Sequence, residues 1–192
     1  MSRRSALFIF ITSLLFSETW ELKKSTDYYK AYTKGDRTKT YRIESNFSLN
    51  PDEIFNFLTS FDKFHKIYNN IESIEILYKN DSTVIHYSVM DSPWPVSNRD
   101  LITRIDFKKV DGTYIMKSCA ADEMNIPVKN DLVRISEFNE KIIIRPDGSN
   151  RSELIIEGKI GFGGNIPQWL QSAALLSGPI TTMDKLKEIS RR

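Results

Sequence analysis

The side chains that most often carry catalysis or metal binding are few in this chain of 192 residues. It has two histidines, His65 and His86, and a single cysteine, Cys119. A zinc site needs three or four ligands, and these three residues lie far apart in the sequence. The sequence also lacks a His-x-x-x-His pair, a Gly-x-Ser-x-Gly motif and a glycine loop with the Lys and Ser/Thr that cradle phosphate. We therefore expect a binding protein rather than an enzyme, with no metal and no cofactor.

Length and charge narrow the possible partners. The chain has the length of one domain, and its formal net charge is only +2. A charge this small gives no indication of nucleic-acid binding. Because Cys119 has no second cysteine to pair with, side-chain packing must stabilise the fold in place of an internal disulfide. We expect a monomer that binds no nucleic acid.

The N-terminus has the pattern of a secretory signal. Arg3 and Arg4 precede an apolar run over residues 6–16, which is shorter than the roughly 20 residues that span a bilayer. The small residue Ser17 provides a cleavage point. The pattern predicts a signal peptide over residues 1–17, a domain over residues 18–192, and export to the periplasm or the cell exterior. An uncleaved anchor and a buried helix remain alternatives for the same run.

Alternating apolar and polar residues predict a series of antiparallel strands. Turn sequences separate them, among them Asn80-Asp81-Ser82, Asp111-Gly112, Asn139-Glu140 and Asp147-Gly148. The strands are expected over residues 20–24, 28–34, 40–49, 72–79, 83–90, 100–110, 113–121, 132–138, 141–145 and 151–162. Short turns between consecutive strands imply an antiparallel sheet with one dry face and one wet face.

Two helices complete the predicted elements. Asn50 is a good N-cap for a helix that begins at Pro51. A second, longer helix is expected over residues 166–190, with a kink at Gly178-Pro179. Its apolar stripe can cover the dry face of the sheet, so the predicted fold class is α+β, with a curved antiparallel sheet wrapped around a C-terminal helix.

Four motifs then resemble the START domains, the steroidogenic-acute-regulatory-related lipid-transfer modules. They are Pro93-Trp94-Pro95-Val96-Ser97-Asn98-Arg99-Asp100, Leu132-Val133-Arg134-Ile135, Gly163-Gly164-Asn165-Ile166-Pro167-Gln168-Trp169-Leu170 and Gly178-Pro179. The opening strands near Trp20 are also similar to those of the family. The motifs stand in the order of the family and cover nearly the whole chain after residue 19.

The resemblance implies a helix-grip fold, an incomplete antiparallel barrel that grips its C-terminal helix. It also implies a lipid or sterol-like ligand in an internal tunnel, transient contact with a membrane, and lipid transfer or sensing in the cell envelope. Two alternatives stay open. One is a cyclase- or hydrolase-like enzyme of the same fold, in which Tyr114 or His86 acts on a polyketide-like substrate. The other is an envelope interaction domain whose interior is filled.

The candidate site residues follow from the dry faces of the strands, the helix stripe and the resemblance. Thr103 can offer a hydroxyl to a ligand headgroup, although a β-branched strand former looks the same in sequence. Arg99 and Asp100 are expected to form a local charge-assisted bond that fixes the corner before them. Met124, Ile126 and Pro127 form the apolar tip of a loop over residues 121–131, which the resemblance makes a gate and which could equally pack on the last helix. The expected tunnel-lining residues are Trp94, Leu101, Thr103, Ile105, Phe107, Tyr114, Met116, Ser118, Ile156, Gly158, Ile160, Trp169, Ala173, Leu176 and Ile180.

Overall fold

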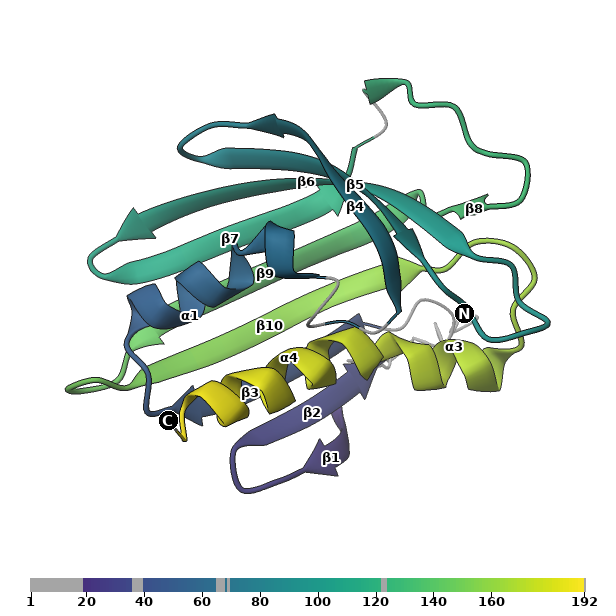
Figure 1. Ribbon diagram of the computed structural model, residues 1–192. Coiled ribbons are helices and arrows are strands. Elements are labelled where there is room, and N and C mark those ends of the chain that lie inside the picture. The colour runs from purple at the N-terminus through teal and green to yellow at the C-terminus, as the bar shows by residue number, and fades with distance from the viewer. Residues whose placement is uncertain (1–18, 36–39, 65–67, 69, 122–123, 192) are drawn as a thin grey trace, which may run out of the picture.

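The computed structural model describes residues 19–35, 40–64, 68, 70–121 and 124–191, and Figure 1 shows the arrangement of its elements. The strands are β1 (Glu21–Ser25), β2 (Tyr29–Lys34), β3 (Thr40–Phe47), β4 (Ile71–Lys79), β5 (Thr83–Met90), β6 (Arg99–Val110), β7 (Thr113–Ala120), β8 (Val133–Arg134), β9 (Glu137–Pro146) and β10 (Ser152–Gly161). The helices are α1 (Pro51–Leu58), α3 (Gln168–Leu175) and α4 (Ser177–Ile189), and a short 3-10 turn, η1, spans Phe61–Lys63.

One large sheet dominates the described part of the chain. Its strands follow the order β1-β2-β3-β10-β9-β7-β6-β5-β4, and all neighbours along this path are antiparallel. The sheet does not close, because β1 and β4 remain as edges. The sheet curves over α4, and α1 lies beside β7 and β9 (Figure 1). The predicted α+β fold, an open antiparallel sheet around a C-terminal helix, is confirmed.

Local sequence signals position several of these elements as expected. Asp111 and Gly112 both have positive φ, 48° and 77°, which a tight turn between β6 and β7 requires. Asn50 caps α1 by accepting a 3.0 Å hydrogen bond from the backbone N–H of Glu53, whose own side chain accepts from the N–H of Asn50 at 2.8 Å.

The predicted turn at Asn139-Glu140 is wrong. Strand β9 runs without interruption over Glu137–Pro146, and it pairs with β7 on one side and β10 on the other. A central strand gains hydrogen bonds and packing on both edges, and these outweigh the weak turn preference of the two residues. The predicted strand over 132–138 is divided: residues 133–134 form β8, which pairs with β6 in parallel, and residues 137–138 begin β9.

The C-terminal helix divides earlier than predicted. Helices α3 and α4 meet at Leu176, and Gly178-Pro179 lies in the first turn of α4, where the missing N–H of proline removes no helical bond. The division changes the helical phase. Trp169 and Ala173 are exposed, while the buried stripe runs through Leu175 and Met183 to Leu186.

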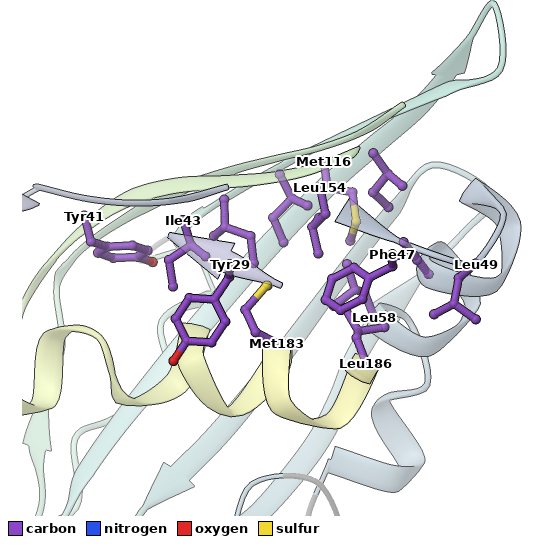
Figure 2. Close-up of a cluster of buried hydrophobic side chains, with 14 of the residues drawn as sticks. Tyr29, Tyr41, Ile43, Phe47, Leu49, Leu58, Met116, Leu154, Met183 and Leu186 are labelled. Atoms are coloured by element: carbon purple, nitrogen blue, oxygen red, sulfur yellow. The ribbon is translucent and has the colours of Figure 1, made fainter. Parts of the chain in front are cut away.

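A single large cluster of buried side chains joins the helices to the sheet. Met183 and Leu186 of α4 are fully buried, and Figure 2 shows them directed towards Ile43, Phe47 and Leu154 of the sheet. At the same end of the molecule, Leu58 of α1 belongs to this cluster. No helix within the described residues is long and apolar enough to span a membrane, and the apolar run over residues 6–16 lies outside them.

Candidate functional site

An inner cavity of about 280 Å³ lies between the sheet and the junction of α3 with α4. The inward-facing residues of β5, β6, β7, β9 and β10 form one wall, and Leu175, Pro179 and Thr182 form part of the other. Leu58, Phe64 and Tyr68 close its side. Seven of the predicted residues line it: Leu101, Thr103, Ile105, Met116, Ser118, Ile156 and Ile160.

A second, outer cavity of about 550 Å³ adjoins the inner one. The two cavities share lining residues, among them Tyr68, Phe162 and Gly178. The outer cavity is also lined by Ala173, another predicted residue, and by the exposed residues Pro93 and Gln171, so it reaches the protein surface. Together the cavities are in the range of about 300–1,000 Å³ that holds a small-molecule ligand.

A hydrogen bond between Tyr41 and Glu140 spans one wall of the inner cavity, with a donor–acceptor distance of 2.6 Å. The two residues come from β3 and β9, and Gly158 of β10 lies between them in register. A Cβ atom at position 158 would lie 2.7 Å from both the Tyr41 hydroxyl and the Asn139 carbonyl oxygen. Gly158 therefore does not line the inner cavity itself, but its missing side chain makes room for the tyrosine ring.

Burial governs the electrostatics around Glu140. Burial raises the pKa of its carboxyl group, while the hydrogen bond from Tyr41 acts in the opposite direction. Burial, and then the nearby carboxyl, raise the pKa of Tyr41. Tyr68 has its pKa raised to about 12, chiefly by burial, and its hydroxyl lies 2.6 Å from that of Thr182. This corner of the cavity thus holds several polar groups that favour their uncharged forms.

His86 of β5 also lines the inner cavity and is 7% exposed. Burial lowers the pKa of its imidazole to about 4, so the ring is neutral at neutral pH. Its Nδ1 atom has no hydrogen-bond partner among the described residues. Thr103 lies directly across from it on β6.

Besides Trp94, seven of the predicted tunnel residues do not line the inner cavity. Phe107 and Tyr114 face inward but pack against Phe55 of α1, at the end of the sheet covered by that helix. The Phe55 ring stacks on Tyr114 at a centroid distance of 4.1 Å. The interior is therefore filled at this end and hollow at the other. Five residues remain. Gly158 is described above, and Ala173 lines the outer cavity. Leu176 and Ile180 pack on the main core, and Trp169 is 72% exposed.

Trp94, expected to line the tunnel, does not line it, because its side chain is 93% exposed. Its neighbours Pro93 and Val96 line the outer cavity, as does Ala173, one helical turn after Trp169. Both tryptophans are therefore exposed next to residues that line that cavity. The break at Leu176 explains why the predicted apolar stripe of α3 faces solvent.

The expected bond between Arg99 and Asp100 is also wrong, because adjacent residues of a strand point to opposite faces of the sheet. The carboxylate of Asp100 is fully buried and accepts two hydrogen bonds from Arg134, at 2.8 and 2.9 Å, and one from Tyr87 at 3.1 Å. Arg99 instead donates to the backbone carbonyls of Ser97, Phe162 and Gly163. These contacts tie the corner before β6 to β8 and to the entry of α3, so the family-like motifs meet in space.

The apolar loop lies away from the cavity. Met124 and Ile126 pack against Ile85, Tyr87 and Ile102. Those residues face the outer side of the sheet, because they alternate with the cavity-facing residues of β5 and β6. Pro127 is exposed. The loop thus covers a second, smaller core, and neither a gate over the cavity nor a contact with the last helix describes its position.

Sequence reasoning missed Tyr41, Tyr68, Glu140 and Thr182 as cavity residues. The signal for Glu140 was present, since Phe138, Glu140, Ile142 and Ile144 alternate with the outward residues of β9. The described residues include no cluster of His, Cys, Asp and Glu that could hold a metal ion.

An open antiparallel sheet that curves around a C-terminal helix is the helix-grip fold. The START domain family model matches residues 15–190, so the chain belongs to the START domain family. An uncharacterised protein of Pseudomonas aeruginosa is 24% identical over 180 residues, which cover 92% of this chain and 89% of that protein. The phosphatidylcholine transfer protein of Mus musculus is 26% identical over 107 residues, covering 52% of this chain and about half, 49%, of the relative.

Solved structures show the same fold. The STAR-related lipid transfer protein from Xanthomonas axonopodis superposes with a TM-score of 0.79 at 24% identity, over 90% of this chain and 99% of that chain. The Zhui aromatase/cyclase of a Streptomyces species reaches a TM-score of 0.59 at 9% identity, over 81% and 95% of the two chains. Identities this low establish the shared fold alone.

Proposed function

We propose that this START-family protein binds one lipid or other hydrophobic small molecule in its two adjoining cavities and carries it between membranes. The observation that carries the proposal is the inner cavity itself, which lies under the α3–α4 junction and is lined mainly by apolar side chains with a few placed polar groups. Sites of this composition bind apolar ligands and use the polar groups for orientation. The named lipid-transfer functions of the murine relative and the Xanthomonas protein support the same function here.

A carrier accounts for the site better than an enzyme does. Tyr114 packs on α1 and bonds to Asp52, away from the inner cavity. His86 does line it, but a histidine that acts as a base is normally oriented by a hydrogen bond to its second nitrogen. The partnerless Nδ1 of His86 lacks such a bond among the described residues.

The proposal includes a transient membrane contact at the rim of the outer cavity. Trp94 and Trp169 are 93% and 72% exposed, and tryptophan side chains are enriched where a protein meets the lipid headgroups. Pro93 and Leu170, which adjoin them in the chain, line the outer cavity. A carrier that docks there would bring its cavity to the bilayer.

We also propose that the carrier works as a monomer in the cell envelope after export. The basic start and apolar run over residues 1–17 support the export. Fusion of residues 1–17 to a reporter enzyme that is active only after export tests the proposed export directly. Reporter activity and removal of the segment support export, whereas a reporter that stays inside the cell argues against it.

Transfer between vesicles tests the carrier function. Donor vesicles hold a fluorescent lipid together with a quencher, and unlabelled acceptor vesicles are added with the purified protein. The proposal predicts a transfer rate that rises in proportion to protein concentration. A rate no higher than that of an unrelated protein, for each of the sterol, phospholipid and neutral-lipid probes, would reject it.

A further inference from the structure

The inner cavity offers polar contacts but no positive charge among its described lining residues, which include Glu140 and His86 but neither Lys nor Arg. Arg99 and Lys185 line only the outer cavity. Arg99 donates to three backbone carbonyls, and the ammonium of Lys185 lies 3.2 Å from a carboxylate oxygen of Glu188. A phosphate or carboxylate enclosed in the inner cavity would lack a counter-charge there, and burial of an unpaired charge is strongly unfavourable.

Two buried side-chain atoms of the described residues lack a hydrogen-bond partner, the Tyr29 hydroxyl and Nδ1 of His86, and of these two residues only His86 lines the inner cavity. It is 7% exposed, it lines the inner cavity, and its Nδ1 has no partner among the described residues. An unpaired buried nitrogen destabilises a folded protein, so such groups nearly always find a partner in a protein, a water or a ligand.

Thr103 lies beside it. The two residues are directly opposite in the antiparallel register of β5 and β6, which places their Cβ atoms about 4.5–5.5 Å apart on the same face. Thr103 is 4% exposed and also lines the cavity, and its hydroxyl forms no side-chain hydrogen bond within the described part of the chain. A neutral imidazole and a hydroxyl group can together accept from and donate to one small polar group.

Glu140 does not supply a charge for the ligand either. Its carboxyl group already accepts a hydrogen bond from Tyr41, and burial favours its uncharged form. The polar groups that face the inner cavity are thus of a kind that solvates a neutral ligand.

From these contacts we infer that the ligand is an uncharged lipid that carries a hydroxyl group, and that this hydroxyl binds between His86 and Thr103. The inference rests on the proposed function and specifies its ligand class. It separates this protein from a carrier of phospholipids or fatty acids, whose headgroups are charged.

Four probes with the same chain test it: dodecanol, dodecanoate, dodecylammonium and dodecylphosphocholine, each titrated below its micelle concentration into the domain of residues 18–192. Dodecanol should bind at least about tenfold more tightly than the three charged probes. His86→Phe and Thr103→Val should each weaken dodecanol binding about tenfold, which is the effect of one hydrogen bond. Tyr114→Phe is the matched control, because this tyrosine lies outside the inner cavity, and it should leave dodecanol binding unchanged.

Stability separates a ligand-binding role from a structural one. Because His86 has an unpaired nitrogen, the ligand-free His86→Phe variant should unfold at a temperature no lower than that of the wild type. If it fails to fold, Thr103→Val, which preserves the side-chain shape, decides the matter alone. A charged probe that binds as well as dodecanol, or variants that bind dodecanol normally, would overturn the inference and leave the carrier function standing. Failure of all four probes to bind would overturn both.

Discussion

Tyr41 reaches Glu140 across a strand that carries no side chain between them. The tyrosine hydroxyl donates to the carboxyl group at 2.6 Å, over Gly158 of β10, which pairs in register with both residues. This relationship connects three positions distant in sequence and forms one wall of the inner cavity.

The first prediction concerns that glycine. Gly158→Ala places a methyl group 2.7 Å from both the Tyr41 hydroxyl and the backbone oxygen of Asn139, and the backbone oxygen cannot easily move. The expected destabilisation is about 1–3 kcal/mol, the usual effect of overpacking, measured by urea denaturation. Gly178→Ala is the control, because outside its chain neighbours and its own helix backbone no atom lies within 4 Å of the position that its added methyl group would occupy. Equal stability of the two variants would contradict the packing described here.

A second prediction concerns acid stability. The pKa of His86 is lowered from 6.5 to about 4 in the folded protein, so the unfolded chain binds the proton more tightly. The folded state should therefore lose about 3 kcal/mol of stability from this group as the pH falls from above 6.5 to below 4. The raised pKa of Glu140 has the opposite effect on the pH dependence of stability, because the stability that this group contributes diminishes as the pH rises.

The His86→Phe variant isolates the contribution of His86 to the loss of stability in acid. Its free energy of unfolding, measured in urea at pH 7 and at pH 4, should fall less on acidification than that of the wild type, by about 3 kcal/mol. Parallel losses in the two proteins would show that His86 titrates normally in the folded state, and hence that it is not buried as described.

The third prediction concerns Asp100 and Arg134. Arg134→Met leaves the fully buried carboxylate of Asp100 without its cation, which should destabilise the fold by about 3–5 kcal/mol. The exposed pair between Lys159 and Glu137 provides the control, and Lys159→Met should change stability by less than about 1 kcal/mol. Thermal melts of both variants measure the difference, and similar melting temperatures would refute a structural role for the buried pair.

The fourth prediction concerns membrane contact. Removal of both exposed tryptophans, by Trp94→Ala and Trp169→Ala, should lower the affinity for vesicles at least about tenfold. Each tryptophan of the docked wild-type protein would bury a large apolar side chain at the membrane–water interface. Ligand affinity in solution should not change. Val110→Ala serves as the control, since Val110 is 47% exposed at the turn between β6 and β7. Unaltered vesicle binding in the double variant would exclude docking through these two tryptophans.

The sequence predicts this fold well where local chemistry decides the outcome. The Asp111-Gly112 turn, the Asn50 cap and the inward faces of β6, β7 and β10 follow from residues that are close together in the chain. It fails where tertiary contacts decide. Asn139-Glu140 reads as a turn until strands pair on both sides of β9.

The candidate site is predictable to a similar degree. Alternation places Thr103 and Ser118 on the cavity wall, because strand periodicity fixes which face a residue occupies. Alternation cannot show which part of the space between the sheet and the helices is hollow. That depends on α1, whose Phe55 fills the space beside Tyr114, and on the break at Leu176, which turns Trp169 to the solvent.

Ligand retention is the most direct measurement of the central claim. The domain of residues 18–192, purified without detergent, is studied by native mass spectrometry, and the same sample is extracted with organic solvent to identify any adduct. A stoichiometric apolar adduct that is released on unfolding is the predicted result. A mass equal to that of the polypeptide alone, together with no thermal shift from sterols, neutral lipids, fatty acids or phospholipids, would contradict a lipid-binding role.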